Sequence, residues 1–125
     1  MDSIKKFEEQ GKDWLFYSNT SYPSDSRKSY PVYNGFMMYF PDAIMEIAKC
    51  SQTGNLQHHS DKPLHWDRDK SGDELDALSR HLLEAGKTDT DGIKHSAKVA
   101  WRALANLQKE LEAEGNAPLS KYNKK

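Results

Sequence analysis

After residue 40, apolar residues recur at the spacing of an amphipathic helix in three separate stretches of the chain. In the first, Ile44 and Ile47 share one face, and Pro41 fits the first turn because its missing N–H would be unpaired there in any case. Gly54, together with the asparagine after it, supplies a left-handed cap. The pattern predicts a helix over residues 41–53.

The second stretch follows a capping-box pattern, in which Ser71 is a candidate N-cap and Glu74 stands three residues later. Gly86 closes the stretch, so the pattern predicts a helix over residues 72–85. Its apolar face consists of Leu75, Leu78, Leu82 and Ala85.

The third stretch is the clearest element, because its apolar residues are spaced four and three apart throughout. Asp91 is a natural N-cap and Gly115 stops the pattern, which predicts a helix over residues 92–114. The connection from the second helix is short, so these two helices should be antiparallel neighbours. The heptad seam consists of Ile93, Ala97, Ala100, Leu104, Leu107 and Leu111.

Together the patterns predict an all-α fold whose three-helix core occupies residues 40–115. Residues 1–39 form a loop-rich arm with many aromatic side chains, and residues 116–125 form a flexible tail. No apolar period runs from residue 56 to residue 70, which predicts a long ordered loop anchored by Trp66.

The chain is poor in apolar residues, since only 21 of its 125 residues are Leu, Ile, Val or Phe. Three helices with such narrow seams enclose little core alone, so the sequence predicts a homo-oligomer, a dimer or tetramer, with the third helix at or near the interface. A net charge of −1 gives no general attraction to a nucleic acid polymer or an anionic membrane. The short apolar runs exclude a membrane span, and the lack of a signal-peptide pattern predicts a cytoplasmic protein.

Paired carboxylates lie on the first two predicted helices. Asp42 and Glu46 are four residues apart, and Asp73 and Asp76 are three apart, so each pair shares a helix face. Mg²⁺ prefers oxygen ligands and usually takes one or two carboxylates plus waters and substrate phosphates. Acidic residues are also common in first turns, where they favour the helix dipole. The spacing alone leaves both interpretations open.

Histidine and basic side chains follow on the second and third helices. His81 lies beside the apolar face of the second helix, where a histidine is more often a hydrogen-bonded core residue than a ligand. Arg and Lys bind phosphate through a planar donor fork and a point charge, but a solvated helix face carries the same residue types. The stripe that could bind phosphate consists of Asp91, His95, Lys98 and Arg102 on the third helix, and without further context the solvated face is the favoured interpretation. The spacing of His58, His59 and His65 matches no common zinc motif.

One set of motifs resembles a known family. The runs 40–48, 75–83 and 99–104, with Gly54, Trp66, Asp89, Asp91, Gly92 and His95, resemble the phage-encoded dATP/dGTP diphosphohydrolase-like domain. That domain is similar to the all-α, MazG-like nucleoside triphosphate pyrophosphohydrolases. The resemblance implies a helical, usually oligomeric enzyme that uses Mg²⁺ or Mn²⁺ to cleave a (deoxy)nucleoside triphosphate into its monophosphate and pyrophosphate.

The resemblance also implies roles for individual residues. The implied metal ligands are Asp42, Glu46, Asp73 and Asp76, and the implied catalytic residues are Glu46, Asp76, His81 and His95. The implied substrate-binding residues are Arg80, Lys98 and Arg102 at the phosphates, Trp66 at the base, and Asp91.

The chain departs from the MazG-like pattern, because it lacks a Glu-Glu-x-x-Glu motif and carries Asp73 where that pattern has Glu. This departure, together with the Tyr-rich arm, motivates a second hypothesis: a phage-type protein that sequesters a signalling nucleotide without hydrolysing it. A third hypothesis is a helical oligomer whose heptad seam serves assembly alone.

Overall fold

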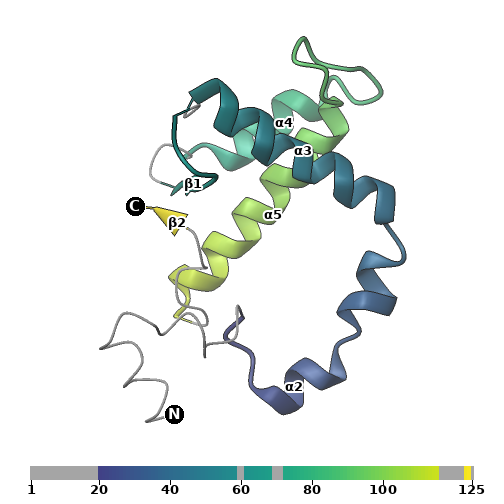
Figure 1. Cartoon of the computed structure of the whole chain (residues 1–125), viewed down its shortest axis with the longest axis vertical. Helices are drawn as coiled ribbons and strands as arrows, with labels where there is room; N and C mark the ends of the chain where they lie inside the picture. The colour runs from purple at the N-terminus through teal and green to yellow at the C-terminus, as the bar shows by residue number, and fades with distance from the viewer. Residues whose placement is uncertain (1–19, 59–60, 69–71, 116–122, 125) are drawn as a thin grey trace.

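The computed structural model describes residues 20–58, 61–68, 72–115 and 123–124, and most of that length is helical (Figure 1). The predicted all-α fold class is confirmed. The described elements are α2 (Ser24–Ser29), the π-helix η2 (Tyr33–Met37), α3 (Pro41–His58), β1 (Trp66–Asp67), α4 (Glu74–Leu82), α5 (His95–Ala113) and β2 (Asn123–Lys124).

The first predicted helix, α3, begins at Pro41 as expected but does not end at Gly54. The prediction of a left-handed cap is wrong, since Gly54 has no positive φ and the helix continues to His58. Asn55 is buried in the last turns, and its side-chain amide donates to the carbonyl of Lys62 at 3.3 Å. This contact joins the last turns of α3 to the following loop, and it acts against the roughly 1 kcal/mol by which a glycine weakens a helix interior.

The second predicted helix, α4, is shorter at both ends than residues 72–85. Asp73 occupies the N-cap position without a side-chain capping bond, and the predicted cap Ser71 lies outside the described residues. Beyond the helix the backbone forms turns that are closed by hydrogen bonds between residues three apart. One of them runs from the N–H of Glu84 to the carbonyl of His81, at 3.0 Å. Gly86, which is predicted to close this helix, lies four residues beyond its end at Leu82 and has a φ of +92°, a left-handed conformation that suits glycine.

The third predicted helix, α5, begins at His95 rather than at residue 92, and the prediction that Asp91 is its N-cap is wrong. The Asp91 carboxylate instead accepts the N–H of Ile93 at 3.0 Å, inside a turn that the Thr88–Lys94 bridge closes. Asp side chains form such local bonds in competition with a helix, which delays the helix start. The turn projects beyond the helices at the top of Figure 1.

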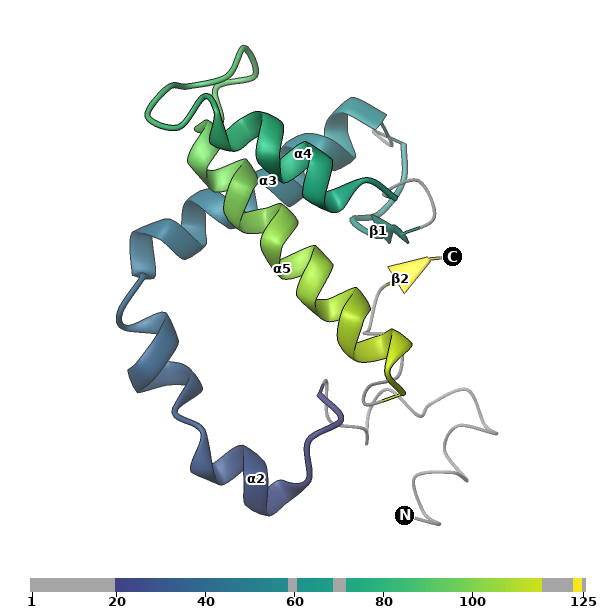
Figure 2. The ribbon, with the colours of Figure 1, turned by 180° about the vertical axis from the view of Figure 1, so that it is seen from behind.

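α5 is the central element, because it packs extensively against α4 and also against α3 (Figures 1 and 2). Small residues dominate its buried positions, so the helix backbones approach closely and polar groups of α4 and α5 come within reach of each other. A hydrogen bond from Trp101 Nε1 to Ser51 Oγ, at 2.9 Å, joins α5 to α3. The buried apolar residues described are Ala77, Ile93, Ala97 and Ala105.

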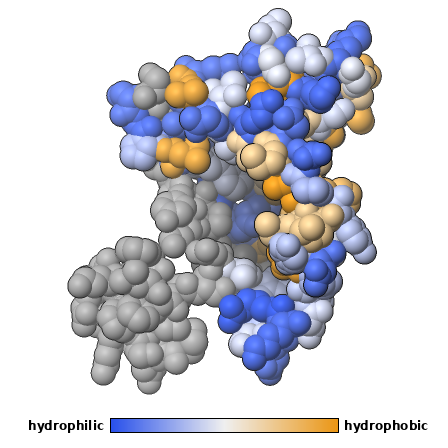
Figure 3. Space-filling model, turned by 45° about the vertical axis from the view of Figure 1, so that its right-hand side comes forward, coloured by the Kyte–Doolittle hydropathy of each residue, from blue (hydrophilic) through white to orange (hydrophobic). Residues whose placement is uncertain are grey.

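The heptad seam is buried only at its start. Ile93 and Ala97 are buried, whereas Leu104 and Leu107 are 46% and 51% exposed. Figure 3 shows that apolar side chains interrupt the polar surface of the described residues. Among the helices of this described part, none combines the length and the apolar character that a membrane crossing needs.

The arm and the long loop contain structure that the sequence does not predict. Both α2 and η2 are helical, and they extend away from the three packed helices in Figures 1 and 2. In the loop, β1 pairs in parallel with β2, which belongs to the predicted tail. Arg68 is buried after β1, and its Nη2 donates to Glu112 Oε2 at 2.7 Å. This ion pair fastens the loop to the end of α5.

Candidate functional site

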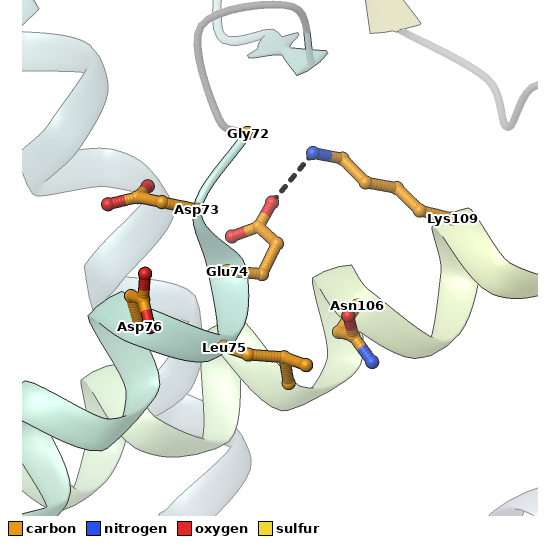
Figure 4. A pocket seen from close by; sticks show the side chains of 7 residues that line it. All are labelled: Gly72, Asp73, Glu74, Leu75, Asp76, Asn106 and Lys109. Atoms are coloured by element: carbon orange, nitrogen blue, oxygen red, sulfur yellow. Dashed lines mark ion pairs between the residues drawn. The ribbon is translucent and has the colours of Figure 1, made fainter.

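Two polar clusters lie at opposite ends of the antiparallel α4–α5 pair. At a rise of 1.5 Å per residue, the eight residues from Asp73 to His81 separate them by about 12 Å. The turn cluster, at the connection between the helices, consists of His81, Asp89, Asp91, His95 and Lys98. The acidic hollow, at the start of α4, has a volume of about 290 Å³ and is lined by Gly72, Asp73, Glu74, Leu75, Asp76, Asn106 and Lys109 (Figure 4).

Lys98 is the charged centre of the turn cluster. Its Nζ donates to Asp89 Oδ2 at 2.6 Å and to Asp91 Oδ2 at 2.7 Å. Burial acts to lower the pKa of Lys98, but the two carboxylates outweigh it and raise the pKa above its ordinary value. The bond from Lys98, helped by the N–H of Thr90, lowers the pKa of Asp89 to about 2. The two sequence-predicted substrate residues Asp91 and Lys98 are therefore bonded to each other.

His81 and His95 face each other across the helix pair. Their Nδ1 atoms are 2.9 Å apart, and His95 Nε2 lies 4.0 Å from Asp89 Oδ1. Burial lowers the pKa of His81, and the charge of Lys98 acts in the same direction. One ligand atom from each of His81, Asp89 and His95 lies within 4.8 Å of the others. These three residues could hold a metal ion.

Glu74 is the buried carboxylate of the acidic hollow, with its side chain only 5% exposed. Its Oε1 accepts from Arg102 Nη1 at 2.8 Å, and its Oε2 pairs with Lys109 Nζ at 2.8 Å (Figure 4). Two cations thus compensate one buried anion, which a buried carboxylate requires. Arg102, which the sequence predicts at the phosphates, is here an internal partner that fastens α4 to α5.

Asp73 and Asp76 are exposed and line the same hollow, so the structure brings this sequence-predicted pair together. Asp73 Oδ2 accepts from Arg80 Nη2 at 3.1 Å, and the two side chains are 53% and 65% exposed. The bond from Arg80 lowers the pKa of Asp73. Figure 4 shows the Asp73 carboxylate turned away from Lys109, toward which Glu74 points.

Asp42 and Glu46, the sequence-predicted metal residues of the first helix, lie on α3. The extensive packing of α3 is against α5, and Glu46 Oε2 pairs with Lys49 Nζ at 2.9 Å. Over the residues that the structure describes, the set of three metal-ligating side chains that converges is the one in the turn cluster, and it includes none of the predicted carboxylates. The oxygen donors of the hollow nevertheless fit Mg²⁺, because that cation needs only one or two carboxylates and completes its shell with water.

Trp66, the sequence-predicted base-stacking residue, is half-buried beside the hollow. The ring meets Trp101 edge-to-face with the centroids 5.7 Å apart, and Arg68 Cζ lies 4.0 Å from the Trp66 centroid. Lys109 Nζ is 5.8 Å from the same ring. Lys109 therefore connects the tryptophan to the acidic hollow.

The roles of Glu74 and Asp89 are missing from the sequence interpretation, which treats Glu74 as part of a capping box. The sequence feature that could have indicated the role of Glu74 is the seven-residue separation of Arg102 and Lys109. This spacing places both cations on one face of α5, where one carboxylate can reach both. For Asp89 the sequence offers a weaker indication, because His81, one of the two histidines near it, is eight residues earlier and only the fold brings the two side chains close.

The comparisons with known proteins support the resemblance. The family model described as dATP/dGTP diphosphohydrolase, N-terminal, matches residues 24–118, which span both polar clusters. No curated protein and no solved structure matches the chain. Since the match covers well over half of the sequence, the chain belongs to the dATP/dGTP diphosphohydrolase N-terminal family.

Proposed function

We propose that this member of the dATP/dGTP diphosphohydrolase N-terminal family hydrolyses (deoxy)nucleoside triphosphates to the monophosphate and pyrophosphate, with Mg²⁺ or Mn²⁺ as its cofactor. The observation that carries the proposal is the family match, which contains the whole acidic hollow. The hollow offers exposed carboxylates for a hard cation, and Arg80, which is bonded to Asp73, is a basic side chain next to it that could bind phosphate oxygens.

Asp73 and Asp76 are the residues of the hollow that would hold the cation. Both are exposed, so water would complete the coordination that Mg²⁺ prefers. Glu74 does not join them, because its two oxygens already bind Arg102 and Lys109. When bound, the cation orients the attacking water and offsets the charge that develops on the phosphates.

Asp42 and Glu46 remain proposed ligands from α3. Glu46 is engaged by Lys49 in a pair whose side chains are 34% and 52% exposed. Pairs exposed to this extent contribute only about 0–1 kcal/mol, so a cation can displace Lys49 from the carboxylate.

Arg80 is the proposed phosphate ligand at the hollow. Its bond to Asp73 is exposed, so Arg80 can move to a phosphate oxygen at low cost. Lys98 and Arg102 would first have to release protein carboxylates, so their proposed phosphate contacts are secondary. Trp66 is the proposed base platform, since it lies beside Lys109.

The test is to incubate the full chain with dATP or dGTP and Mg²⁺ and to separate monophosphate and pyrophosphate by ion-exchange chromatography. Asp76→Asn is expected to lower the rate about 100-fold, at the upper end of the 10–100-fold cost of losing a group that only supports a metal ligand. Asp25→Asn, at an exposed carboxylate in α2, is the matched control and should keep the full rate. Equal rates in the two variants would contradict the proposed cation site.

Sequestration without hydrolysis is the second candidate function. The observation that favours it is that two proposed metal carboxylates, Glu46 and Asp73, are paired with basic side chains. Equilibrium dialysis with dATP, dGTP and cyclic dinucleotides measures binding in the same samples. Ligand that is bound and recovered intact would support sequestration and reject hydrolysis.

We also propose a homo-oligomer, dimer or tetramer, because Leu104 and Leu107 of the seam are half-exposed. A second copy that covers them would bury apolar surface worth about 25 cal/mol per Å². Light scattering at micromolar concentration is expected to show the oligomer, and Leu104→Lys combined with Leu107→Lys should yield the monomer.

A further inference from the structure

We propose that His81, Asp89 and His95 form a site for a divalent transition-metal cation at the turn end of the α4–α5 pair. The three residues come from three parts of the chain: the last turn of α4, the connecting turn and the first position of α5. One ligand atom of each lies within 4.8 Å of the other two. The fold thus brings together three donors that are 6 to 14 residues apart in the sequence.

The facing histidines are already close to a ligating arrangement. Their Nδ1 atoms are 2.9 Å apart, whereas two nitrogen ligands at tetrahedral Zn²⁺, with bonds of about 2.0–2.1 Å, are roughly 3.3 Å apart. A small separation of the two rings therefore makes room for a cation. Without one, the same two nitrogens share a single proton in a hydrogen bond. Asp89 Oδ1 lies 4.0 Å from the other ring nitrogen of His95, Nε2, so the carboxylate stands beside the histidine pair.

The surroundings hold the carboxylate in place. Lys98 Nζ donates to Asp89 Oδ2 at 2.6 Å, and the backbone N–H of Thr90 donates to Asp89 Oδ1 at 2.7 Å. Oδ1 also accepts from the Thr90 hydroxyl at 3.4 Å, which is long for a bond between two oxygens, so a cation can replace that contact. Such supporting bonds orient a ligand before the metal arrives and are a regular feature of metal sites.

The backbone of the turn is equally constrained. The N–H of Asp89 donates to the carbonyl of Ile93 at 2.8 Å, and the N–H of His95 donates to the carbonyl of Lys87 at 3.0 Å. Gly92 has a φ of +83°, a conformation that glycine adopts without strain. The ligands of the proposed site therefore stand on a closed, hydrogen-bonded turn and on two helix ends.

The donor set selects the class of cation. Two imidazole nitrogens and one carboxylate oxygen suit Zn²⁺ and other first-row transition ions, whereas Mg²⁺ and Ca²⁺ prefer oxygen ligands alone. Three protein ligands leave at least one position for water. The site is thus chemically distinct from the acidic hollow, where the donors are all oxygen, and it does not depend on the proposed hydrolysis.

The experiment uses the full chain, stripped with a chelator and dialysed against Zn²⁺, and measures bound zinc by elemental analysis. We expect about one Zn²⁺ per chain, the single position that three converging ligands define. His81→Gln and His95→Gln should each weaken Zn²⁺ binding more than about 100-fold. His65→Gln, which changes a histidine of the loop after α3, is the matched control and should bind like the unaltered chain.

A second measurement separates loss of the site from loss of the fold. Zn²⁺ should raise the thermal midpoint of the unaltered chain and of His65→Gln, because a ligand that binds only the folded state stabilises it. It should leave the midpoint of Asp89→Asn, which keeps both imidazoles, almost unchanged. Circular dichroism checks that each variant stays helical. Absence of bound zinc in the unaltered chain, or undiminished binding in folded His81→Gln, would overturn the proposal, and neither result would bear on Mg²⁺-dependent hydrolysis at the hollow.

Discussion

The two ends of the α4–α5 pair show how the same two helices present different chemistry. At the turn end, His81 and His95 face each other and Lys98 joins two carboxylates, so nitrogen and oxygen donors are mixed. At the acidic hollow the anionic groups are Asp73, Glu74 and Asp76, and the donors there are oxygens. The different donor sets are the reason why we propose a transition-metal cation at one end and Mg²⁺ at the other.

Burial separates structural from available charges within the hollow. Glu74 is 5% exposed and bound by two cations, whereas its neighbour Asp73 is 53% exposed with one exposed partner. A buried ion pair is costly to break and an exposed one is not. The comparison teaches that, of two adjacent carboxylates, Glu74 is committed to internal ion pairs, whereas Asp73 remains accessible to the proposed cation.

The strongest test of this division is Glu74→Gln. The substitution keeps the shape of the side chain but leaves Arg102 and Lys109 without their shared anion. We expect a loss of about 3 kcal/mol in the free energy of unfolding, at the lower end of the cost of removing one partner of a buried pair, because both cations are partly exposed. Urea denaturation at neutral pH measures it.

Asp76→Asn is the matched control for Glu74→Gln, because it removes a carboxylate from the same turn of α4. Asp76 is exposed, so the change in unfolding free energy should stay within about 0.5 kcal/mol. The same variant is expected to lose hydrolysis, which would separate stability from activity two residues apart. A loss of stability in Asp76→Asn as large as in Glu74→Gln would contradict the division.

Lys98→Met tests the turn end and should have a smaller effect. The variant keeps the aliphatic stem but removes the ammonium between Asp89 and Asp91, and we expect a loss of about 1–2 kcal/mol at neutral pH. Lys87→Met is the control, since Lys87 pairs only with the exposed Glu84 among the described contacts. Comparable losses in the two lysine variants would show that Lys98 has no special role.

The effect of Lys98→Met should also depend on pH, and the direction follows from the shifted pKa values. The pKa of Asp89 is lowered from 3.8 to about 2, so its contribution is complete above 3.8 and is lost as the pH falls toward 2. The pKa of Lys98 is raised above 10.5, so its contribution is complete below 10.5 and is lost at higher pH. Urea denaturation at about pH 2.5 should therefore show a smaller difference between the variant and the unaltered chain than at neutral pH.

The sequence predicts those parts of the fold that depend on local pattern. The seam of α5 and the glycines Gly86 and Gly115 mark real elements and real left-handed positions. It fails at Gly54 and Asp91, because contacts from elsewhere decide both: a buried Asn55 bonded to the following loop extends α3, and a local bond to Ile93 delays α5.

For the candidate sites the same limit holds. Asp73, at the N-cap of α4, and Asp76, in its first turn, both line the acidic hollow, as residues three apart at a helix start can; their role as metal ligands stays a prediction. The partners of Glu74 are 28 and 35 residues later, and the nitrogen facing His81 is 14 residues later. The spacing of Arg102 and Lys109 within α5 places them on one face, but it does not identify Glu74 as their partner, because that depends on how α4 packs against α5.

The smallest effect on stability is expected for Arg80→Gln, which removes the exposed partner of Asp73. The denaturation midpoint should not move measurably, because exposed ion pairs contribute about 0–1 kcal/mol. If Arg80 binds substrate phosphate, however, the KM for dATP or dGTP should rise about 10-fold with kcat little changed, as expected when binding is lost equally from ground and transition states. Arg27→Gln, on the exposed helix α2, is the matched control for the lost charge. An unchanged KM in Arg80→Gln would show that the Asp73–Arg80 bond is a surface ion pair without a role in substrate binding. Lys109, which lines the hollow and is paired with Glu74, would then be the candidate for the phosphate contact.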